Sequence, residues 1–366
     1  MYFAFDEDQE EFRASLRRLL AERAPMTAVR EIAATRGFDS TIWRTLTGDM
    51  GVPGLHIAEE LGGSGFSFLE TAIVAQELGR ALTPVPMIAT TGALEAVFRL
   101  GSPELRTELV PVLASGQAVG TLAVSVERDL EVAAATVRAT GTGPVTLDGR
   151  LDHVAFGHIA DLLVVPAVTP GGDAVALYVV EASASGVTAT VRDSLDPTRP
   201  LATVEFAGAP ARLLGSDRAA IDRVVDFVRI LLANEAIGAS QAALDMAVAY
   251  AKQRVQFNRV IGSFQAIKHK CADMAIAIES TQAAVMYASM CVDTDSEDLP
   301  VAAVMAKSQA SECLTLCAGH NIQVHGGIGF TWEADPHLYF RRAKAIEPLF
   351  GSIAAHTARL ADLVGI

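Results

Sequence analysis

The chain has 366 residues, of which 51% are hydrophobic and 20% are charged, and its formal net charge is −14. This length and composition are those of a globular chain with two or three domains rather than of a disordered one. The acidic balance argues against a surface that binds nucleic acid or an anionic membrane.

The sequence also predicts a cytoplasmic protein without a membrane anchor or a metal site. The N-terminal residues lack the basic and apolar regions of a signal peptide, and no uninterrupted apolar run reaches the roughly 18 residues of a membrane span. No C-x-x-C pair and no second ligand pair at zinc-site spacing occur. We therefore expect reduced, partly buried thiols at the four cysteines, Cys271, Cys291, Cys313 and Cys317.

Helical patterns fill the first part of the chain, and we expect an all-helical domain at residues 1–118. Between residues 6 and 24, apolar side chains recur at helical spacing, with acidic residues in the first turn and arginines near the end. The same reasoning predicts further helices at residues 41–50, 69–81, 90–100 and 102–115.

The amino-acid composition changes in the middle of the chain, which is rich in Val, Thr and Ala and has turns of Gly, Asp and Pro at intervals. Regularly spaced short strands of this kind indicate an antiparallel barrel or sandwich. We expect this β domain at residues 119–214, with strands at 145–149, 162–168, 174–180 and 203–206.

From residue 215 to residue 366 the helical signal returns, which gives an α+β chain with α–β–α order. The first two helical segments are long and apolar on more than one face, as in the inner helices of a bundle. The expected segments are residues 221–253, 264–293, 300–324 and 336–365.

A loop after the first long helix carries groups suited to a dinucleotide. Arg254 could neutralise phosphate, Phe257 could pack against a cofactor, and the amides of Gln256 and Gln265 could fix an edge. The alternative is a solvated basic helix end closed by a Gly-Ser loop.

A second candidate follows a later helix, where Gln323 precedes the adjacent glycines Gly326 and Gly327. A glycine that caps a helix C-terminus explains one of the two glycines, and the second is less well explained in that way.

Together with Arg342-Ala-Lys344, these two motifs resemble those of the acyl-CoA dehydrogenase family of flavoproteins. The resemblance covers nearly the whole chain and implies an N-terminal helical domain, a middle β domain and a C-terminal four-helix bundle. It implies that the cofactor is FAD. It also implies that the loop at Arg254 binds the pyrophosphate and adenine end of FAD across a subunit interface, and that Gly326 and Gly327 let the backbone approach the diphosphate.

The positions that contact the flavin ring in relatives match the family less well. Ser125 keeps the hydroxyl of a strand end that contacts the ring in relatives, and Phe156 stands where a Trp usually covers the ring's other side. The alternative for both residues is ordinary strand packing.

The resemblance also raises the question of the catalytic base. Relatives remove the α-proton of a thioester with a Glu, but the two customary positions hold Phe350 and Val228 here. Glu235 lies seven residues after Val228, nearly on the same helical face, and its neighbours are apolar. It is the candidate base, and the alternative is a buried structural Glu paired with a cation.

For the substrate, the resemblance places Arg229 and the loop at Phe350 and Gly351 near the thioester. In relatives the backbone N–H at the position of Phe350 polarises the thioester carbonyl, and such a donor survives any side-chain change. The alternative for Arg229 is a solvated helix charge.

The sequence therefore favours an FAD-dependent acyl-CoA dehydrogenase that introduces an α,β double bond into a CoA thioester, and the resemblance suggests a branched or steroid-derived acyl group. Its expected partners are an acyl-CoA substrate, an electron-transfer flavoprotein, and further subunits in a homodimer, homotetramer or heterotetramer. One rival is a non-catalytic subunit that completes the FAD site of a sister chain. The other is a different flavoenzyme on the same fold, such as a monooxygenase.

Overall fold

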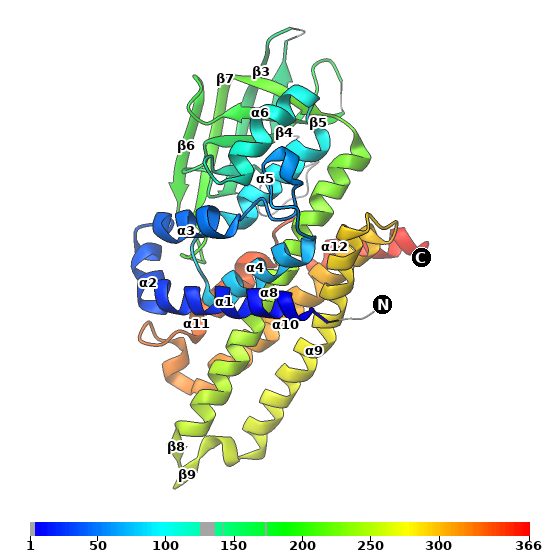
Figure 1. Cartoon of the computed structure of the whole chain (residues 1–366). Helices are drawn as coiled ribbons and strands as arrows, with labels where there is room; N and C mark the ends of the chain where they lie inside the picture. The colour runs from blue at the N-terminus through cyan, green and yellow to red at the C-terminus, as the bar shows by residue number, and fades with distance from the viewer. Residues whose placement is uncertain (1–3, 125–135, 142, 173) are drawn as a thin grey trace.

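The computed structural model describes residues 4–124, 136–141, 143–172 and 174–366. Along the chain, helices give way to strands and then to helices again, so the expected α–β–α order is confirmed (Figure 1). The expected boundaries at 118–119 and 214–215 fall after the sixth helix and at the end of the last barrel strand, and as domain boundaries they stay predictions.

The N-terminal helices begin where local capping chemistry predicts. The Asp6 side chain accepts from the Gln9 backbone N–H, and the Gln9 side chain returns the bond to Asp6 in a capping box. Ser67 and Ser102 cap later helices, and their side chains accept from the backbone N–H groups of Leu69 and Leu105. The elements are α1 (Glu7–Arg23), α2 (Met26–Ala34), α3 (Ser40–Met50), η1 (Glu59–Leu61), α4 (Phe68–Ala81), α5 (Met87–Leu100) and α6 (Pro103–Ala114). The sequence patterns did not predict α2.

The middle region is a barrel rather than an open sheet. Strands pair around a closed ring in the order β4–β2–β3–β7–β5 and back to β4, while β1 joins β4 and β6 joins β7. The β1–β4 and β2–β4 pairs are parallel and the other pairs are antiparallel. The strands are β1 (Gly120–Leu122), β2 (Val137–Thr140), β3 (Val145–Ala155), β4 (Leu162–Val168), β5 (Val175–Glu181), β6 (Val187–Arg192) and β7 (Leu201–Gly215).

The C-terminal region is a helical bundle whose three long helices run side by side, with a small hairpin at one tip (Figure 1). Its elements are α8 (Arg218–Gln253), β8 (Val255–Gln256), β9 (Arg259–Val260), η2 (Ile261–Ser263), α9 (Gln265–Asp293), α10 (Leu299–His325), η3 (Gly326–Phe330), α11 (Pro336–Ile346) and α12 (Ile353–Val364). Among the described helices, α9 alone has the length and apolar composition of a membrane span, and it packs along α8, α10 and α4 as a bundle helix does.

Two glycines bring α4 and α8 into backbone contact. A Cβ added to Gly238 on α8 would lie 1.8 Å from the carbonyl oxygen of Gln76 on α4. A Cβ added to Gly79 on α4 would lie 2.1 Å from the carbonyl oxygen of Glu235 on α8. Because only glycine permits so close an approach, these two positions set where Glu235 stands relative to the N-terminal helices.

The last expected helical segment, residues 336–365, is in fact two helices, and a buried lysine holds the break between them. Lys307 of α10 donates from Nζ to the carbonyl oxygens of Ile346 and Glu347, at 3.0 and 3.2 Å, and to Ser311 Oγ at 3.1 Å. These bonds satisfy carbonyl groups that α11 leaves open at its C-terminus. Burial lowers the pKa of Lys307 to about 7, and the neighbouring Arg229 acts in the same direction.

We expect Gly238→Ala to lower the free energy of unfolding by about 3 kcal/mol, because the new methyl group would force α8 away from α4. The control is Gly319→Ala on α10, where an added Cβ would meet nothing within 4 Å. That variant should gain about 0.5–1 kcal/mol from helix propensity. Denaturant titration measures both values, and equal effects of the two substitutions would contradict the close approach.

Lys307 should also make stability depend on pH. Its pKa is about 7 in the folded protein against an ordinary value of 10.5, so the unfolded chain binds more protons between these values. Stability should therefore rise with pH in this range, by up to about 1.4 kcal/mol per pH unit, and Lys307→Met should remove this slope. The control is Lys252→Met at an exposed position of α8. Identical slopes in wild type and Lys307→Met, measured from pH 7 to 9, would show that Lys307 keeps its proton when buried.

Candidate active site

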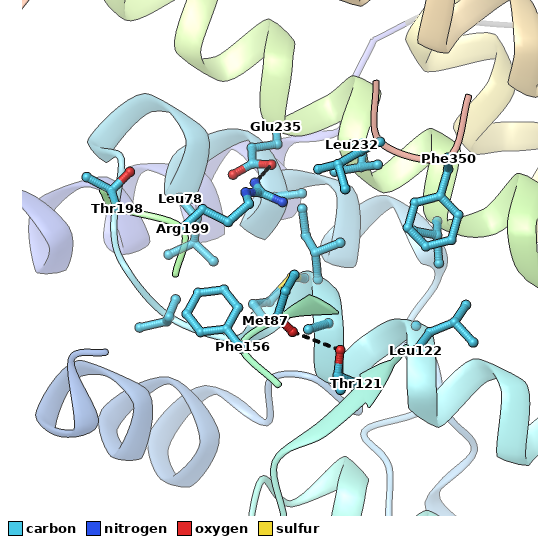
Figure 2. A pocket seen from close by; sticks show the side chains of 18 of the residues that line it. Leu78, Met87, Thr121, Leu122, Phe156, Thr198, Arg199, Leu232, Glu235 and Phe350 are labelled. Carbon is cyan, nitrogen blue, oxygen red and sulfur yellow. Dashed lines mark hydrogen bonds and ion pairs between the residues drawn. The ribbon is translucent and has the colours of Figure 1, made fainter. Parts of the chain in front are cut away.

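A mostly apolar pocket lies where the three regions of the chain meet (Figure 2). Residues of α4, α5 and α8 form part of its wall, and the ends of β1 and β3 and the loop after α11 complete it. Its apolar lining includes Leu78, Val85, Met87, Ile88, Leu122, Phe156, Val228, Leu232, Leu349 and Phe350. Such a pocket excludes water and suits an apolar acyl group.

One end of the pocket is charged. Glu235 of α8 accepts at Oε1 from Arg342 of α11 and at Oε2 from Arg199, which lies in the loop between β6 and β7. Arg342 also bonds to Asp196, and its Nη2 donates to Thr198 Oγ1 at 2.5 Å. All five side chains are buried. We call them the Glu235 network.

The network bears directly on Glu235 as the candidate base. Glu235 is the only acidic residue among the described residues that line the pocket, so the structure places it where a base would act. Both of its oxygens, however, are bonded to guanidinium groups. If Glu235 took a proton from a substrate, it would lose the negative charge that balances two buried guanidinium groups, which favours a structural role. The catalytic assignment stays a prediction.

Phe156 and Phe350 both line the pocket, on opposite sides in the view of Figure 2. Their φ angles are 55° and 56°, in the left-handed region that bulky side chains seldom adopt. Such conformations cost of order 1–3 kcal/mol each and cluster at functional sites. Ser125, the other residue expected near the flavin ring, lies outside the described residues.

Arg229 does not line the pocket but holds one of its walls. Its Nε donates to the carbonyl oxygen of Phe350 at 3.0 Å, and its Nη1 donates to Asp226 Oδ1 at 2.7 Å. Burial lowers the pKa of Arg229 while Asp226 acts to raise it. The solvated helix charge considered for this residue is therefore excluded, because the side chain is buried and fixes the Phe350 loop.

Gly351 continues that loop and packs against a buried histidine. A Cβ added to Gly351 would lie 2.7 Å from Cε1 of His356, and its φ of 113° also favours glycine. Burial, with Arg229 and Lys307 nearby, lowers the pKa of His356 to about 3. The ring is therefore neutral at ordinary pH, so the loop at Phe350 and Gly351 rests on a neutral group.

The residues expected to bind the FAD tail lie far from this pocket, at the tip of the bundle (Figure 1). The β8–β9 hairpin turns through Phe257 and Asn258, which have φ of 53° and 60°, and this is the geometry of a type I′ turn. The Phe257 side chain is 85% exposed, and Gln256 and Gln265 are also exposed. Arg254 makes only backbone hydrogen bonds within the described residues.

The second tail motif adjoins the first. His325, at the end of α10, stacks on Tyr250 near the end of α8 with ring centroids 4.1 Å apart. Gln323, Gly326 and Gly327 are exposed beside it, and a Cβ added to either glycine would meet nothing within 4 Å. We call Arg254, Gln256, Phe257, Gln265 and these three residues the hairpin corner.

The chemistry of the hairpin corner fits the nucleotide end of FAD. An arginine without a side-chain partner, an exposed aromatic ring and a bare stretch of glycine backbone are the groups that a diphosphate and an adenine need. Arg254 follows Glu235 by 19 residues along α8, which places the two about 28 Å apart. The corner and the pocket of one chain are thus widely separated, as expected if they serve different cofactor molecules in an oligomer.

Sequence reasoning missed three members of the Glu235 network, Asp196, Thr198 and Arg199. The loop Asp196-Pro-Thr-Arg199 reads as an ordinary turn between strands. Its partners, Glu235 and Arg342, come 36 to 146 residues later, so no local spacing links them. The available signal was Glu235 itself, since a carboxylate among apolar neighbours needs a buried cation.

Family models match the two helical regions of the chain. The model for the acyl-CoA dehydrogenase N-terminal domain matches residues 6–117, and the model for the C-terminal domain matches residues 218–364. The acyl-CoA dehydrogenase IpdE2 of Mycobacterium tuberculosis is 36% identical over 350 residues, which are 94% of this chain and 94% of that protein.

Solved structures with a similar fold include complexes of two different chains. The ChsE4–ChsE5 complex of Mycobacterium tuberculosis matches with a TM-score of 0.90 and 28% identity, over 100% of this chain and 99% of that one. The steroid ACAD Tcur3481–Tcur3483 matches with a TM-score of 0.89 and 29% identity, over 98% of each chain. The expected fold and cofactor are confirmed, and the chain belongs to the acyl-CoA dehydrogenase family, whose members are FAD-dependent oxidoreductases that act on CH–CH bonds.

Proposed function

We propose that this chain is one subunit of an FAD-dependent acyl-CoA dehydrogenase whose catalytic base comes from a second chain of the same fold. The observation that carries the proposal is the state of Glu235. It is the only acid among the described pocket-lining residues, and two arginines hold it. The customary base positions hold the uncharged side chains of Val228 and Phe350.

In the reaction, a base removes the α-proton of the CoA thioester, and FAD, when bound, would supply the hydride acceptor for the β-carbon. The residues of this chain would prepare the site for these events. The apolar pocket excludes water from the acyl group, and Arg229 fixes the loop whose Phe350 N–H would polarise the thioester carbonyl. Arg254 and the rest of the hairpin corner would bind the nucleotide tail of FAD.

The comparisons support the finer parts of this proposal. ChsE4–ChsE5 is a complex of two chains, and the Tcur3481–Tcur3483 structure is described as a steroid ACAD. A heterotetramer acting on a bulky, ring-containing acyl-CoA fits these relatives and the apolar lining of the pocket. The electrons would pass to an electron-transfer flavoprotein, and the acidic chain with its free cysteines would work in the cytoplasm.

A second function is favoured by the position of Glu235 in the pocket. In this alternative the chain forms a homodimer or homotetramer and Glu235 itself acts as the base. The two functions differ in what the chain does without a partner, which makes them separable by experiment.

We expect the chain expressed alone to show no loss of flavin absorbance when a cyclic acyl-CoA is added without an electron acceptor. Co-expression with a second acyl-CoA dehydrogenase-like chain from the same genome should give a complex with bound FAD whose visible absorbance falls on addition of the thioester. Absorbance spectra and FAD content measure both preparations. Loss of flavin absorbance (bleaching) in the chain alone would refute the two-chain proposal and favour Glu235 as the base.

The role of Glu235 is tested in whichever preparation is active. Glu235→Gln and Asp196→Asn each remove one carboxylate from the Glu235 network, but Asp196 does not line the pocket. If Glu235 is structural, both variants should lower thermal stability and slow bleaching to a similar extent. A loss of bleaching confined to Glu235→Gln, with FAD still bound, would identify Glu235 as the base.

Arg254→Gln should weaken FAD binding by roughly 10- to 100-fold, because a charge-assisted hydrogen bond to phosphate is worth about 1.5–3 kcal/mol. The melting temperature of the apoprotein should not change, since no described side chain bonds Arg254. Arg18→Gln, at an exposed position of α1, is the matched control. FAD titration followed by flavin fluorescence gives the affinities, and equal affinities in both variants would remove Arg254 from the cofactor site.

A further inference from the structure

Of the two arginines that line the pocket, Arg199 uses fewer of its side-chain hydrogen-bond donors than Arg342 does. A guanidinium carries five N–H donors, yet within the described residues the Arg199 side chain makes a single bond, to Glu235. Its Nε is buried without a partner. The residue is 7% exposed. Because Nε has almost no accessible surface, the unused donors that an occupant of the pocket could reach are those of the two Nη atoms.

The location of Arg199 points to an occupant of the pocket. The side chain lies between the Glu235 carboxylate and the Phe156 ring in the view of Figure 2, at one side of a cavity that is otherwise mostly apolar. Phe350, beside which the thioester would sit under the proposed function, is on the other side in that view. The unused donors of Arg199 would therefore face the part of the pocket away from the thioester.

The charge balance of the Glu235 network limits what this occupant can be. Two cations, Arg199 and Arg342, face two anions, Glu235 and Asp196, and no other charged residue is among the described lining residues. An added carboxylate would leave one negative charge unpaired in a buried site, which is costly. An uncharged oxygen that accepts a hydrogen bond adds no charge and satisfies the free donors.

We propose that Arg199 is a specificity-determining residue that donates a hydrogen bond to an uncharged oxygen, a keto or hydroxyl group, on a ring of the acyl substrate. This inference rests on the proposed function and names its substrate class as oxygenated cyclic acyl-CoA thioesters. A site built to bond such an oxygen discriminates strongly against the analogue that lacks it, because its buried donors then stay unpaired.

The test compares three kinds of CoA thioester: cyclohexanecarboxyl-CoA, its 3-oxo and 4-oxo derivatives, and 4-carboxycyclohexanecarboxyl-CoA. Affinities for the FAD-loaded protein, with its partner chain where one co-purifies, are measured by calorimetry without an electron acceptor. We expect at least one oxo derivative to bind tenfold or more tightly than the unsubstituted thioester, and the carboxy derivative to bind no better than the unsubstituted one.

Arg199→Met should reduce this preference, measured as the ratio of the two affinities, to about twofold or less. Ile88→Val, an apolar change in the same pocket, is the matched control and should shift both affinities in parallel. Should Arg199→Met fold poorly, the double variant Arg199→Met/Glu235→Gln removes one charge of each sign, keeps the site balanced and leaves no donor at position 199. The preference should be lost in that variant too.

Equal binding of the oxo and unsubstituted thioesters by the wild type would overturn the inference and leave the proposed function intact. A preference that survives in both Arg199 variants would also overturn it, because another group would then read the oxygen. Tightest binding of the carboxy derivative would refute the charge-balance argument. Failure of every thioester to bind would reject the inference together with the proposed function.

Discussion

The structure around the pocket depends on the ion pairs that Glu235 makes with Arg199 and Arg342. They join α8 to the loop between β6 and β7 and to α11, three segments that are distant in sequence. Burial alone would raise the pKa of Asp196, but Arg342, Thr198 and Arg199 hold it below its ordinary value. Removing one partner of a buried pair costs about 3–5 kcal/mol, because the other charge stays behind without compensation. The pocket wall is thus fixed by groups that cannot be lost singly.

These ion pairs mean that the position of Glu235 in the pocket does not by itself make it a catalytic base. A base must be free to accept a proton and to let it go, whereas Glu235 holds together the helical bundle and the barrel. The loop at Phe350 shows the same division of roles. Its backbone is fixed by Arg229 and Lys307, although its side chain has no acid–base chemistry. The fold therefore keeps the frame of the reaction site independently of the group that would move the proton.

The helices and strands could be predicted from the sequence better than the contacts of the pocket. Strand β4 begins and ends at the expected residues, and the capped starts of α1 and α4 lie within a residue of expectation, because turns, caps and periodicity are local signals. The segment expected at 336–365 passed over the break between α11 and α12, although Pro348 and the N-cap Ser352 are local signals for it. Arg199 was missed because its partner, Glu235, lies 36 residues away. The residues of the hairpin corner were proposed because they fall in two short motifs, whereas the Glu235 network is assembled only by folding.

The hairpin corner and the pocket are far apart and are held in place by different residues. The corner depends on a type I′ turn and the stacking of Tyr250 on His325, whereas the pocket depends on the Glu235 network. With about 28 Å of α8 between them, substitutions in one should not disturb the packing of the other. If the corner binds the FAD tail of a neighbouring subunit as proposed, a chain can supply that binding at full strength while its own pocket takes on a different task. Two chains of one fold can then specialise, one for the base and one for the substrate ring, without either losing its stability.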